Sequence, residues 1–364
     1  MITLRGCYAD WEPRWLPLIG FSALTCCAVF ASVPKKLTGA TAISKRPTQT
    51  SVTKTQPDLL NRPARPSPAE PTNLLHGLAW QIALEREGFS PGILDGRIGS
   101  KTRAAFVEFQ TSRRLPAKGQ LDAATAMALP VAEESATTPY IVTDDDADRI
   151  APLPKTWKAK SQAAWLGYES VLEAVAERFH CSRKLLSELN PGTDLTRLKP
   201  SDRIMVPNVM ADSSPKSAHG LEVDLAAKQI RAIDADGNTM GLFHCSVAAK
   251  ESQLPSGNAR VQTISHDPTY MFDPKMWPEV KDVREKLLIP PGPRNPVGRC
   301  WIGLSLPGYG IHGTPNPELI GKTGSHGCIR LTNWDAIRLS RMISVGTPVR
   351  FRCHPGGSRP ASNK

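Results

Sequence analysis

The sequence lacks the paired cysteine spacing of a common zinc site. It contains eight cysteines but no Cys-x-x-Cys pair, and structural zinc sites usually take two ligands at such a short spacing. Helix-turn-helix, zinc-finger and aromatic RNP patterns are also missing, although the net charge is +11. Nucleic acid is therefore not an expected partner, and the positive charge fits a polyanionic polymer or an anionic membrane surface. A surplus of positive side chains spread over the linkers explains the same net charge.

At 364 residues the chain is longer than one ordinary domain. Residues 15–33 contain no charged side chain, and this length suits a signal peptide or a membrane anchor. Residues 1–33 are therefore predicted to direct export, with cleavage and anchoring both open. Residues 34–72 are rich in proline, serine and threonine and are predicted to be a disordered linker. Acidic residues and prolines predict a second linker over 131–163, and 354–364 is predicted to be a disordered tail.

Residues 311–330, IHGTPNPELIGKTGSHGCIR, contain the groups most suited to chemistry. Glycine and proline recur too often there for one helix or strand, so a loop is predicted. A thiol such as Cys328 needs a nearby base to attack a carbonyl, and His312 or His326 can supply one. Gly327 directly before the thiol lets backbone N–H groups turn toward a developing oxyanion. A zinc site and an inert buried thiol are the alternatives.

HGT at 312–314 followed by SHGCIRL at 325–331 resembles the active-site signature of the L,D-transpeptidases, the YkuD-type cysteine enzymes of the bacterial cell wall. The resemblance implies that Cys328 is the nucleophile and that His312 is its general base, which later acts as an acid. The residue after that histidine would orient the imidazole. Here it is Gly313, which can do so only through its backbone carbonyl.

The same resemblance implies roles for the neighbours of the thiol. His326 and Gly327 would lie on the oxyanion side of the site. Ser325 and Arg330 would bind substrate, Arg330 either at the substrate carboxylate or by holding the loop. The resemblance implies no metal and no organic cofactor.

Two further segments resemble wall-binding modules. Residues 73–130 contain G-F-x-P-G-x-L-D-G-x-I-G-x-x-T-R-A-A-x-x-x-F-Q, which resembles the small three-helix peptidoglycan-binding domain. Residues 164–210, with two helical stripes and NPG at 190–192, are similar to a LysM domain. That resemblance implies a βααβ module that binds N-acetylglucosamine-containing chains. GYES at 167–170 stands where the family has Gly-Asp-Thr, so a spacer or docking role is the alternative.

Residues 217–353 are predicted to form the catalytic domain. Apolar and polar residues alternate over 221–225, as in a half-buried strand, and the resemblance implies a mainly β, sandwich-like fold. The whole chain is thus expected to be multidomain α+β. The resemblance further implies an exported protein of the periplasm or cell wall, free or anchored to the cytoplasmic membrane, with peptidoglycan stem peptides and glycan as partners.

The implied reaction is attack by Cys328 on a stem tetrapeptide, at the bond between its diamino acid and D-alanine. An amine acceptor would resolve the acyl-enzyme and give a 3→3 cross-link. Water as acceptor would make an L,D-carboxypeptidase, and a lipoprotein lysine an anchoring enzyme; the sequence does not choose. The rivals are a non-catalytic wall-binding scaffold and a cysteine endopeptidase. In the common wall endopeptidases the cysteine precedes the histidine, the reverse of the order here.

Overall fold

The computed structural model describes residues 73–209, 215–277, 280–325 and 327–352. The predicted export segment 1–33, the predicted linker 34–72 and the predicted tail 354–364 lie outside the described residues, and so does His326. Among the residues that are described, no helix is long and apolar enough to cross a membrane. All of them belong to one compact unit of the chain, Pro66–Lys364.

The first described part is helical, as the sequence predicts. Its helices are α1 (Leu74–Arg86), α2 (Ser100–Ser112) and α3 (Ala123–Ala128). The Asn73 side chain accepts a hydrogen bond from the N–H of Leu75 and so caps α1. The side-chain oxygen of Gln81 accepts hydrogen bonds from the N–H groups of Asp95 and Gly96. A buried glutamine of α1 therefore holds the Asp-Gly turn that the sequence pattern marks.

The middle of the described chain folds around a two-stranded antiparallel sheet. Its strands are β1 (Thr137–Ile141) and β2 (Arg203–Pro207), with Thr137 opposite Pro207. The helices between them in sequence are α4 (Asp144–Asp148), α5 (Trp157–Gln162), α6 (Val171–Arg178) and α7 (Arg183–Leu189). The two helices expected within 164–210 are present. The strand that precedes them, however, lies upstream of the expected boundary.

The prediction that residues 131–163 form a linker is wrong, because this range contains β1, α4 and α5. The acidic run is the first turn of α4, where negative side chains are favoured by the partial positive charge of the helix N-terminus. The carboxylate of Asp146 accepts hydrogen bonds from the N–H and hydroxyl of Thr143 and from the hydroxyl of Tyr140. Helix capping therefore accounts for a composition that is also typical of linkers.

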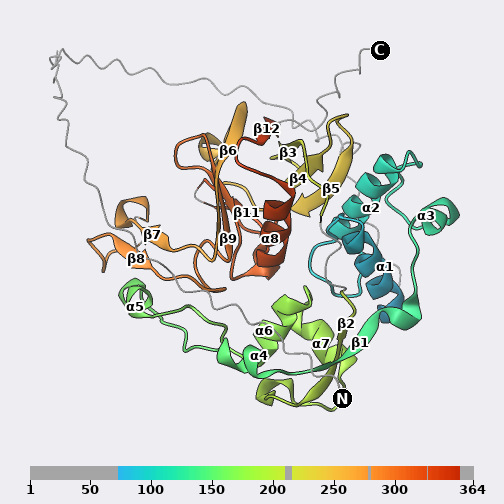
Figure 1. Cartoon of the computed structure of the whole chain (residues 1–364), viewed down its shortest axis with the longest axis horizontal. Helices are drawn as coiled ribbons and strands as arrows, with labels where there is room; N and C mark the ends of the chain where they lie inside the picture. The colour runs from blue at the N-terminus through green and yellow to red at the C-terminus, as the bar shows by residue number, and fades with distance from the viewer. Residues whose placement is uncertain (1–72, 210–214, 278–279, 326, 353–364) are drawn as a thin grey trace, which may run out of the picture. The chain divides into compact units, whose positions relative to one another are not determined.

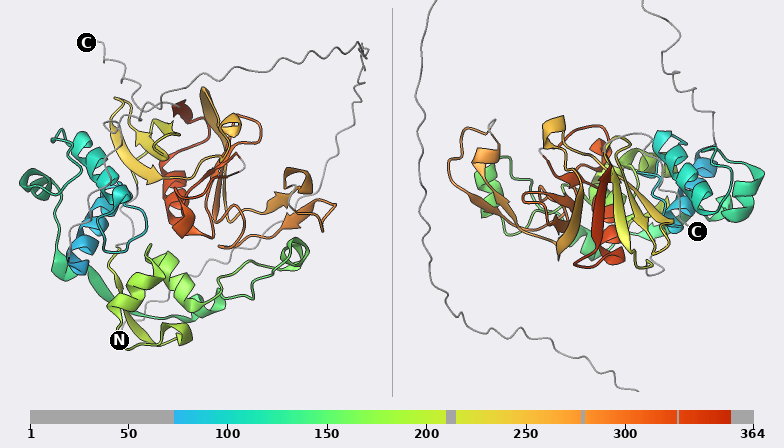
Figure 2. Two further views of the ribbon diagram at one scale, coloured as in Figure 1. Left: turned by 180° about the vertical axis from the view of Figure 1, so that it is seen from behind. Right: turned by 90° about the horizontal axis from the view of Figure 1, so that it is seen from above.

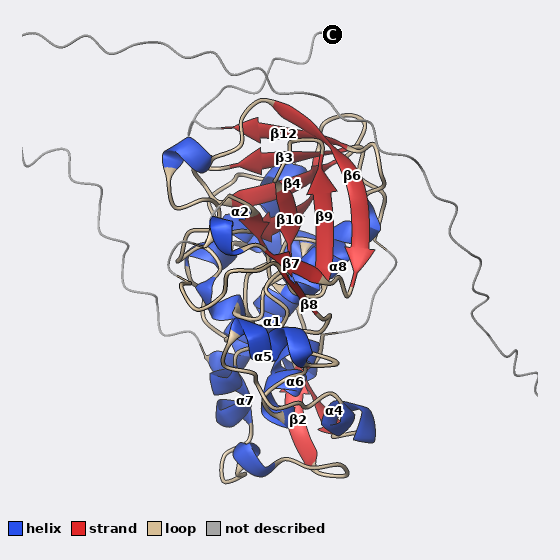
Figure 3. Ribbon diagram, turned by 90° about the vertical axis from the view of Figure 1, so that its left-hand side faces the viewer, coloured by secondary structure: helices blue, strands red, loops and turns tan. Residues whose placement is uncertain are grey.

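The last part of the chain is built on one mixed sheet of eight strands in the order β11-β10-β9-β6-β12-β3-β4-β5. Figure 3 draws the strands in red and labels β3, β4, β6, β9, β10 and β12 of this sheet. Its strands are β3 (Gly220–Asp224), β4 (Gln229–Ile233), β5 (Thr239–His244), β6 (Asn258–His266), β9 (Cys300–Leu304), β10 (Gly310–His312), β11 (Ile329–Arg330) and β12 (Pro348–Arg352). A separate antiparallel pair is β7 (Tyr270–Phe272) and β8 (Leu287–Ile289). Short 3₁₀ helices in the described connections are Glu133–Ser135, Leu195–Arg197, Glu251–Gln253, Pro274–Met276 and Pro317–Leu319.

The sandwich-like arrangement that was expected is replaced by this single curled sheet. The pairs β12–β3 and β10–β11 are parallel, and the other neighbours are antiparallel. The register shifts in β6 opposite β9, between Val261 and Thr263, and in β4 opposite β5, between Ala232 and Ile233. Such irregularities bend a strand and increase its twist, so one sheet can curl around its own core.

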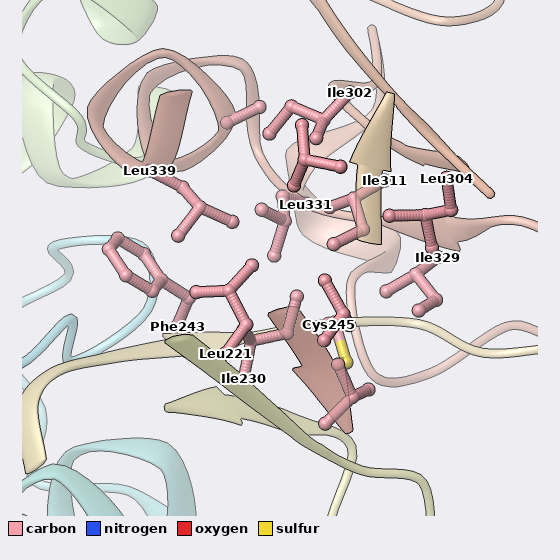
Figure 4. Close-up of a cluster of buried hydrophobic side chains, with 14 of the residues drawn as sticks. Leu221, Ile230, Phe243, Cys245, Ile302, Leu304, Ile311, Ile329, Leu331 and Leu339 are labelled. Atoms are coloured by element: carbon pink, nitrogen blue, oxygen red, sulfur yellow. The ribbon is translucent and has the colours of Figure 1, made fainter. Parts of the chain in front are cut away.

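Helix α8 (Asn333–Met342) packs against β9 and β10 and closes this core. Because alternate strand residues face the same side, Ile302 and Leu304 of β9 point inward together with Ile311 and Ile329 (Figure 4). Leu339 of α8 joins the same buried cluster. The core therefore holds the apolar faces of β9, β10 and β11 in place, and with them the residues of the opposite faces.

Helix α2 lies beside β5, the last strand of the large sheet (Figure 1, Figure 2). The N–H of Ser90 donates to the carbonyl of Leu242 at 2.9 Å, and the N–H of Leu242 donates to the carbonyl of Gly88 at 3.0 Å. A short, half-buried ion pair joins Arg231 of β4 to Glu108 of α2. The first helical part thus covers a sheet edge whose backbone groups would otherwise be exposed.

Candidate active site

The thiol and the imidazole are brought together by the parallel pair β10–β11. Ile311 lies opposite Ile329, and His312 lies opposite Arg330. Cys328 directly precedes β11 and therefore lies two positions from the level of His312. His312 and Cys328 are separated by two residues along the strand direction and by one strand across the sheet, which places their Cα atoms about 8 Å apart. Since the two isoleucines face the core, His312 and Cys328 share the opposite face.

The backbone fixes the orientation of the His312 ring. Its Nδ1 lies 2.7 Å from the carbonyl oxygen of Gly313. A carbonyl can only accept, so Nδ1 carries the hydrogen and Nε2 remains available to take a proton. The indole of Trp301, on β9, stacks on the ring with centroids 5.7 Å apart. Burial lowers the pKa of His312 to about 4, and the positive charge of Arg330 acts in the same direction. The imidazole is therefore neutral near pH 7.

The thiol of Cys328 is partly buried and protonated at rest. Its Sγ lies 3.6 Å from the carbonyl oxygen of Gly308. Burial raises the pKa of this thiol. Burial also raises the pKa of the Tyr270 phenol, and the charge of a Cys328 thiolate acts in the same direction. The resting pair is therefore a neutral thiol and a neutral imidazole, so proton transfer must accompany attack.

The turn before the thiol is held by Ser325. Its hydroxyl donates to the carbonyl of Cys328 at 2.5 Å and accepts from the N–H of Gly327 at 3.2 Å. Gly327 has φ +149°, a backbone conformation that side chains rarely adopt. The Ser325 hydroxyl is thus engaged within the loop, and a contact between it and substrate stays a prediction. The oxyanion role of His326 falls on a residue outside the described ones.

Arg330 holds the loop that leads to the thiol. Its Nη2 donates to the carbonyl and the hydroxyl of Thr323, both at 3.1 Å, and to the carbonyl of Gly324 at 2.5 Å. Of the two expected alternatives for Arg330, these contacts favour support of the loop. Its Nε is buried and makes no hydrogen bond within the described part of the chain. A contact with a substrate carboxylate stays a prediction.

Gly298 and Asn333 lie behind His312, and neither was assigned a role in the site from the sequence. A Cβ added to Gly313 would lie 2.3 Å from Oδ1 of Asn333, and a Cβ added to Gly298 would lie 2.1 Å from the same oxygen. That oxygen also accepts a hydrogen bond from the N–H of Arg299 at 3.1 Å. Asn333 and Gly298 therefore support the peptide that orients the imidazole. The sequence signal was the glycine of NPVG at 295–298, whereas Asn333 and Trp301 have no local signature.

Within the described ranges, no cluster of three or more histidine, cysteine or acidic side chains is placed to hold a metal ion. The thiols of Cys181, Cys245 and Cys300 are free and buried in the described fold. Burial raises the pKa of Cys300 to about 11, and it raises the pKa values of the other two as well. Cys328 is the only described cysteine that is not fully buried, so it is the one suited to nucleophilic attack.

Comparisons with known proteins match two parts of the chain. The family described as "L,D-transpeptidase catalytic domain" matches residues 218–351, and the family described as "Putative peptidoglycan binding domain" matches residues 78–129. The "Putative L,D-transpeptidase YkuD" of Bacillus licheniformis is 30% identical over 179 residues, which are 49% of this chain and 91% of the relative.

Two further proteins are similar over a smaller share of their length. The "Probable L,D-transpeptidase ErfK/SrfK" of Escherichia coli is 29% identical over 199 residues, which are 51% of this chain and 63% of the relative. The chain thus spans less than two thirds of that protein. A crystal structure of an Enterococcus faecium L,D-transpeptidase is 20% identical, with 41% of this chain and 55% of that chain covered, at a TM-score of 0.28. A TM-score this low adds nothing to the fold described above.

Proposed function

Because the chain belongs to the L,D-transpeptidase family, we propose that it is an exported cell-wall enzyme that makes 3→3 cross-links between peptidoglycan stem peptides. The observation that carries this proposal is the shared face of β10 and β11. It presents the neutral thiol of Cys328 beside the neutral imidazole of His312, whose free nitrogen is set by the Gly313 carbonyl. The expected family is confirmed by the comparisons, and the acceptor remains a proposal.

In the proposed first step, the thiol attacks the carbonyl between the diamino acid and the terminal D-alanine of a tetrapeptide. Nε2 of His312 takes the thiol proton as the S–C bond forms, and returns it to the amine of D-alanine as the C–N bond breaks. Backbone N–H groups beside Gly327 stabilise the oxyanion between these events. The product is a thioester on Cys328 with a neutral imidazole next to it.

In the second step, the amine of another stem peptide attacks the thioester. His312 accepts a proton from that amine, and the departing thiolate is protonated again. Water in place of the amine would give a tripeptide, which is the carboxypeptidase outcome. A lipoprotein lysine would give a protein-bound wall. The acceptor determines which of these three products forms, because all three reactions use the same thiol and imidazole.

The modules before the catalytic part are proposed to bring the enzyme to its polymer. The match at 78–129 supports binding of peptidoglycan by the first helical part. Glycan binding by 164–210 stays a prediction, since its helices lie between strands that are far apart in sequence. A family that acts on the cell wall implies a location outside the cytoplasm, in the periplasm or the wall. Export by residues 1–33 stays a prediction.

The test is incubation of the full chain with a disaccharide-tetrapeptide and analysis of the products by mass spectrometry. We expect a cross-linked dimer from the wild type and none from Cys328→Ala or His312→Ala. Cys181→Ala is the matched control, because it removes a buried thiol that belongs to another core cluster than β10 and β11. Tripeptide alone would indicate the carboxypeptidase. No product at all would refute the proposed function, and activity in Cys328→Ala would refute the nucleophile.

A further inference from the structure

We propose that Glu177, on helix α6 outside the catalytic sheet, is a positioning residue for His312. It acts through Asn333, the first residue of α8, and through Gly313. The inference rests on the proposed role of His312 as the base. It makes the middle part of the chain a component of the active site as well as a wall-binding candidate.

The carboxylate of Glu177 uses both of its oxygens. Oε1 accepts a hydrogen bond from the hydroxyl of Tyr168 at 2.8 Å. Oε2 accepts one from Nδ2 of Asn333 at 2.9 Å. Burial raises the pKa of Glu177, and these two hydrogen bonds oppose the rise because they favour the charged form. One side chain of α6 thereby reaches the N-terminus of α8.

The amide of Asn333 can take only one orientation. Its Nδ2 donates to Glu177 and also to the carbonyl of Pro293, at 3.2 Å. Its Oδ1 accepts from the N–H of Arg299. Turning the amide over would place its nitrogen against an N–H donor and its oxygen against two acceptors. The side chain is buried, so water cannot compensate for a wrong orientation.

The fixed amide packs directly against the peptide that orients His312. Oδ1 of Asn333 occupies the place where a Cβ of Gly313 would be, 2.3 Å from the ideal Cβ position. The carbonyl of Gly313 in turn accepts the hydrogen of His312 Nδ1. A shift of Asn333 would therefore move the acceptor that sets both the tautomer and the angle of the imidazole.

Loss of the Glu177 carboxylate should loosen this chain of contacts without unfolding it. One N–H of a buried amide would lose its acceptor, and buried donors without a partner are strongly disfavoured. Glu177 also lines a cavity of about 810 Å³, so the freed amide of Asn333 has room to shift away from Gly313. Misplacement of a catalytic group by about 1 Å can cost a hundredfold in rate.

The matched control is Glu173, one turn earlier on the same helix. It forms a short hydrogen bond with Arg294 in the same interface, and both side chains are largely buried. Within the described residues, the carboxylate of Glu173 makes no hydrogen bond to Asn333. If α6 only holds the parts of the chain together, Glu173→Ala and Glu177→Ala should have equal effects.

The experiment measures the alkylation of Cys328 by iodoacetamide in the full chain from pH 5 to 9, with peptide mass mapping to single out Cys328. In a pair that is neutral at rest, the imidazole must take the proton as the thiol attacks, so this rate reports how well His312 is placed and needs no peptidoglycan substrate. We expect Glu177→Ala to react about tenfold to a hundredfold more slowly, with a pH profile moved toward that of His312→Ala. Glu173→Ala should keep the wild-type profile.

Glu177→Gln should restore most of the rate. A glutamine can accept from Asn333 with its oxygen and donate to the Tyr168 hydroxyl with its nitrogen. It is also the variant to measure if Glu177→Ala does not fold, and a profile like that of His312→Ala would then overturn the proposal. The proposal is equally overturned if Glu177→Ala keeps the wild-type profile, or if Glu173→Ala loses as much.

Failure of the proposed function has a different signature. A chain that makes no cross-link, but shows the expected alkylation pattern in these variants, would refute the transpeptidase and support the positioning role. A chain that cross-links normally in Glu177→Ala would support the transpeptidase and refute the positioning role.

Discussion

Replacement of His244 by glutamine should remove a large part of the acid sensitivity of folding. His244 ends β5 and is buried where the sheet meets α2. Its Nε2 lies 3.1 Å from the carbonyl oxygen of Lys101. Burial lowers the pKa of His244 to about 3, and the charge of Lys101 acts in the same direction. The folded protein therefore holds this ring neutral, while the unfolded chain protonates it with an ordinary pKa of 6.5.

The difference between the two pKa values determines how the stability of the fold depends on pH. A folded pKa below the unfolded one stabilises the fold above pH 6.5, and that stability is lost as the pH falls toward 3. Between pH 7 and pH 4 the loss from this one group is about 3 kcal/mol, at 1.36 kcal/mol per pKa unit. Such an amount is a large fraction of the stability of an ordinary domain.

The assay is urea unfolding of the full chain at pH 7 and pH 4, followed by tryptophan fluorescence. The side-chain N–H of glutamine can still donate to the Lys101 carbonyl, so His244→Gln keeps the hydrogen bond and loses the titration. We expect the wild type to lose about 3 kcal/mol more than the variant between the two pH values. His219→Gln, at an exposed histidine, is the control. Equal losses in the wild type and His244→Gln would refute the reasoning.

Three further outcomes follow from the site. A carbapenem should acylate Cys328, and an unchanged intact mass after incubation would contradict an open thiol. The acid limb of that acylation should lie near pH 4, the pKa that burial gives His312, whereas a limb near 6.5 would show an imidazole exposed to water. Gly298→Ala should cost about 2 kcal/mol or more in thermal unfolding, since its Cβ would lie 2.1 Å from an amide oxygen at φ +64°. Gly237→Ala is the control, because Gly237 has φ +80° and open space around it. Its loss of stability should reflect the backbone strain alone, without a steric clash.

The local part of the structure could be predicted from the sequence. The residues at 221–225 alternate, and all but the last of them lie in β3. The order HGT then SHGCIRL indicated the family that the comparisons confirm. The register in which the strands pair could not be predicted from the sequence. The parallel pairing of Ile311 with Ile329 joins residues 18 positions apart across a glycine-rich loop. Local propensity does not encode such a pairing, because it is set by the common core of several strands.

The linker prediction for 131–163 failed for a related reason. Pro139 lies in β1 opposite Met205 of β2, and a proline is usually a sign against a strand. It is tolerated here because a two-stranded sheet consists of edges, where one missing donor costs little. The partner strand is more than sixty residues away, so no local signal could have marked the segment as a strand.

The same long-range pairings decide how the catalytic site is supported. A glycine at position 313 leaves no side chain to hold the imidazole, so only the backbone carbonyl can do it. A carbonyl is oriented by whatever fixes its peptide, and here that is the amide of Asn333, which is itself held by α6. A site that relies on its backbone in this way depends on elements far from it in sequence. The helical part that contains α6 is therefore expected to affect the site, because Glu177 on α6 contacts the residue that packs against Gly313.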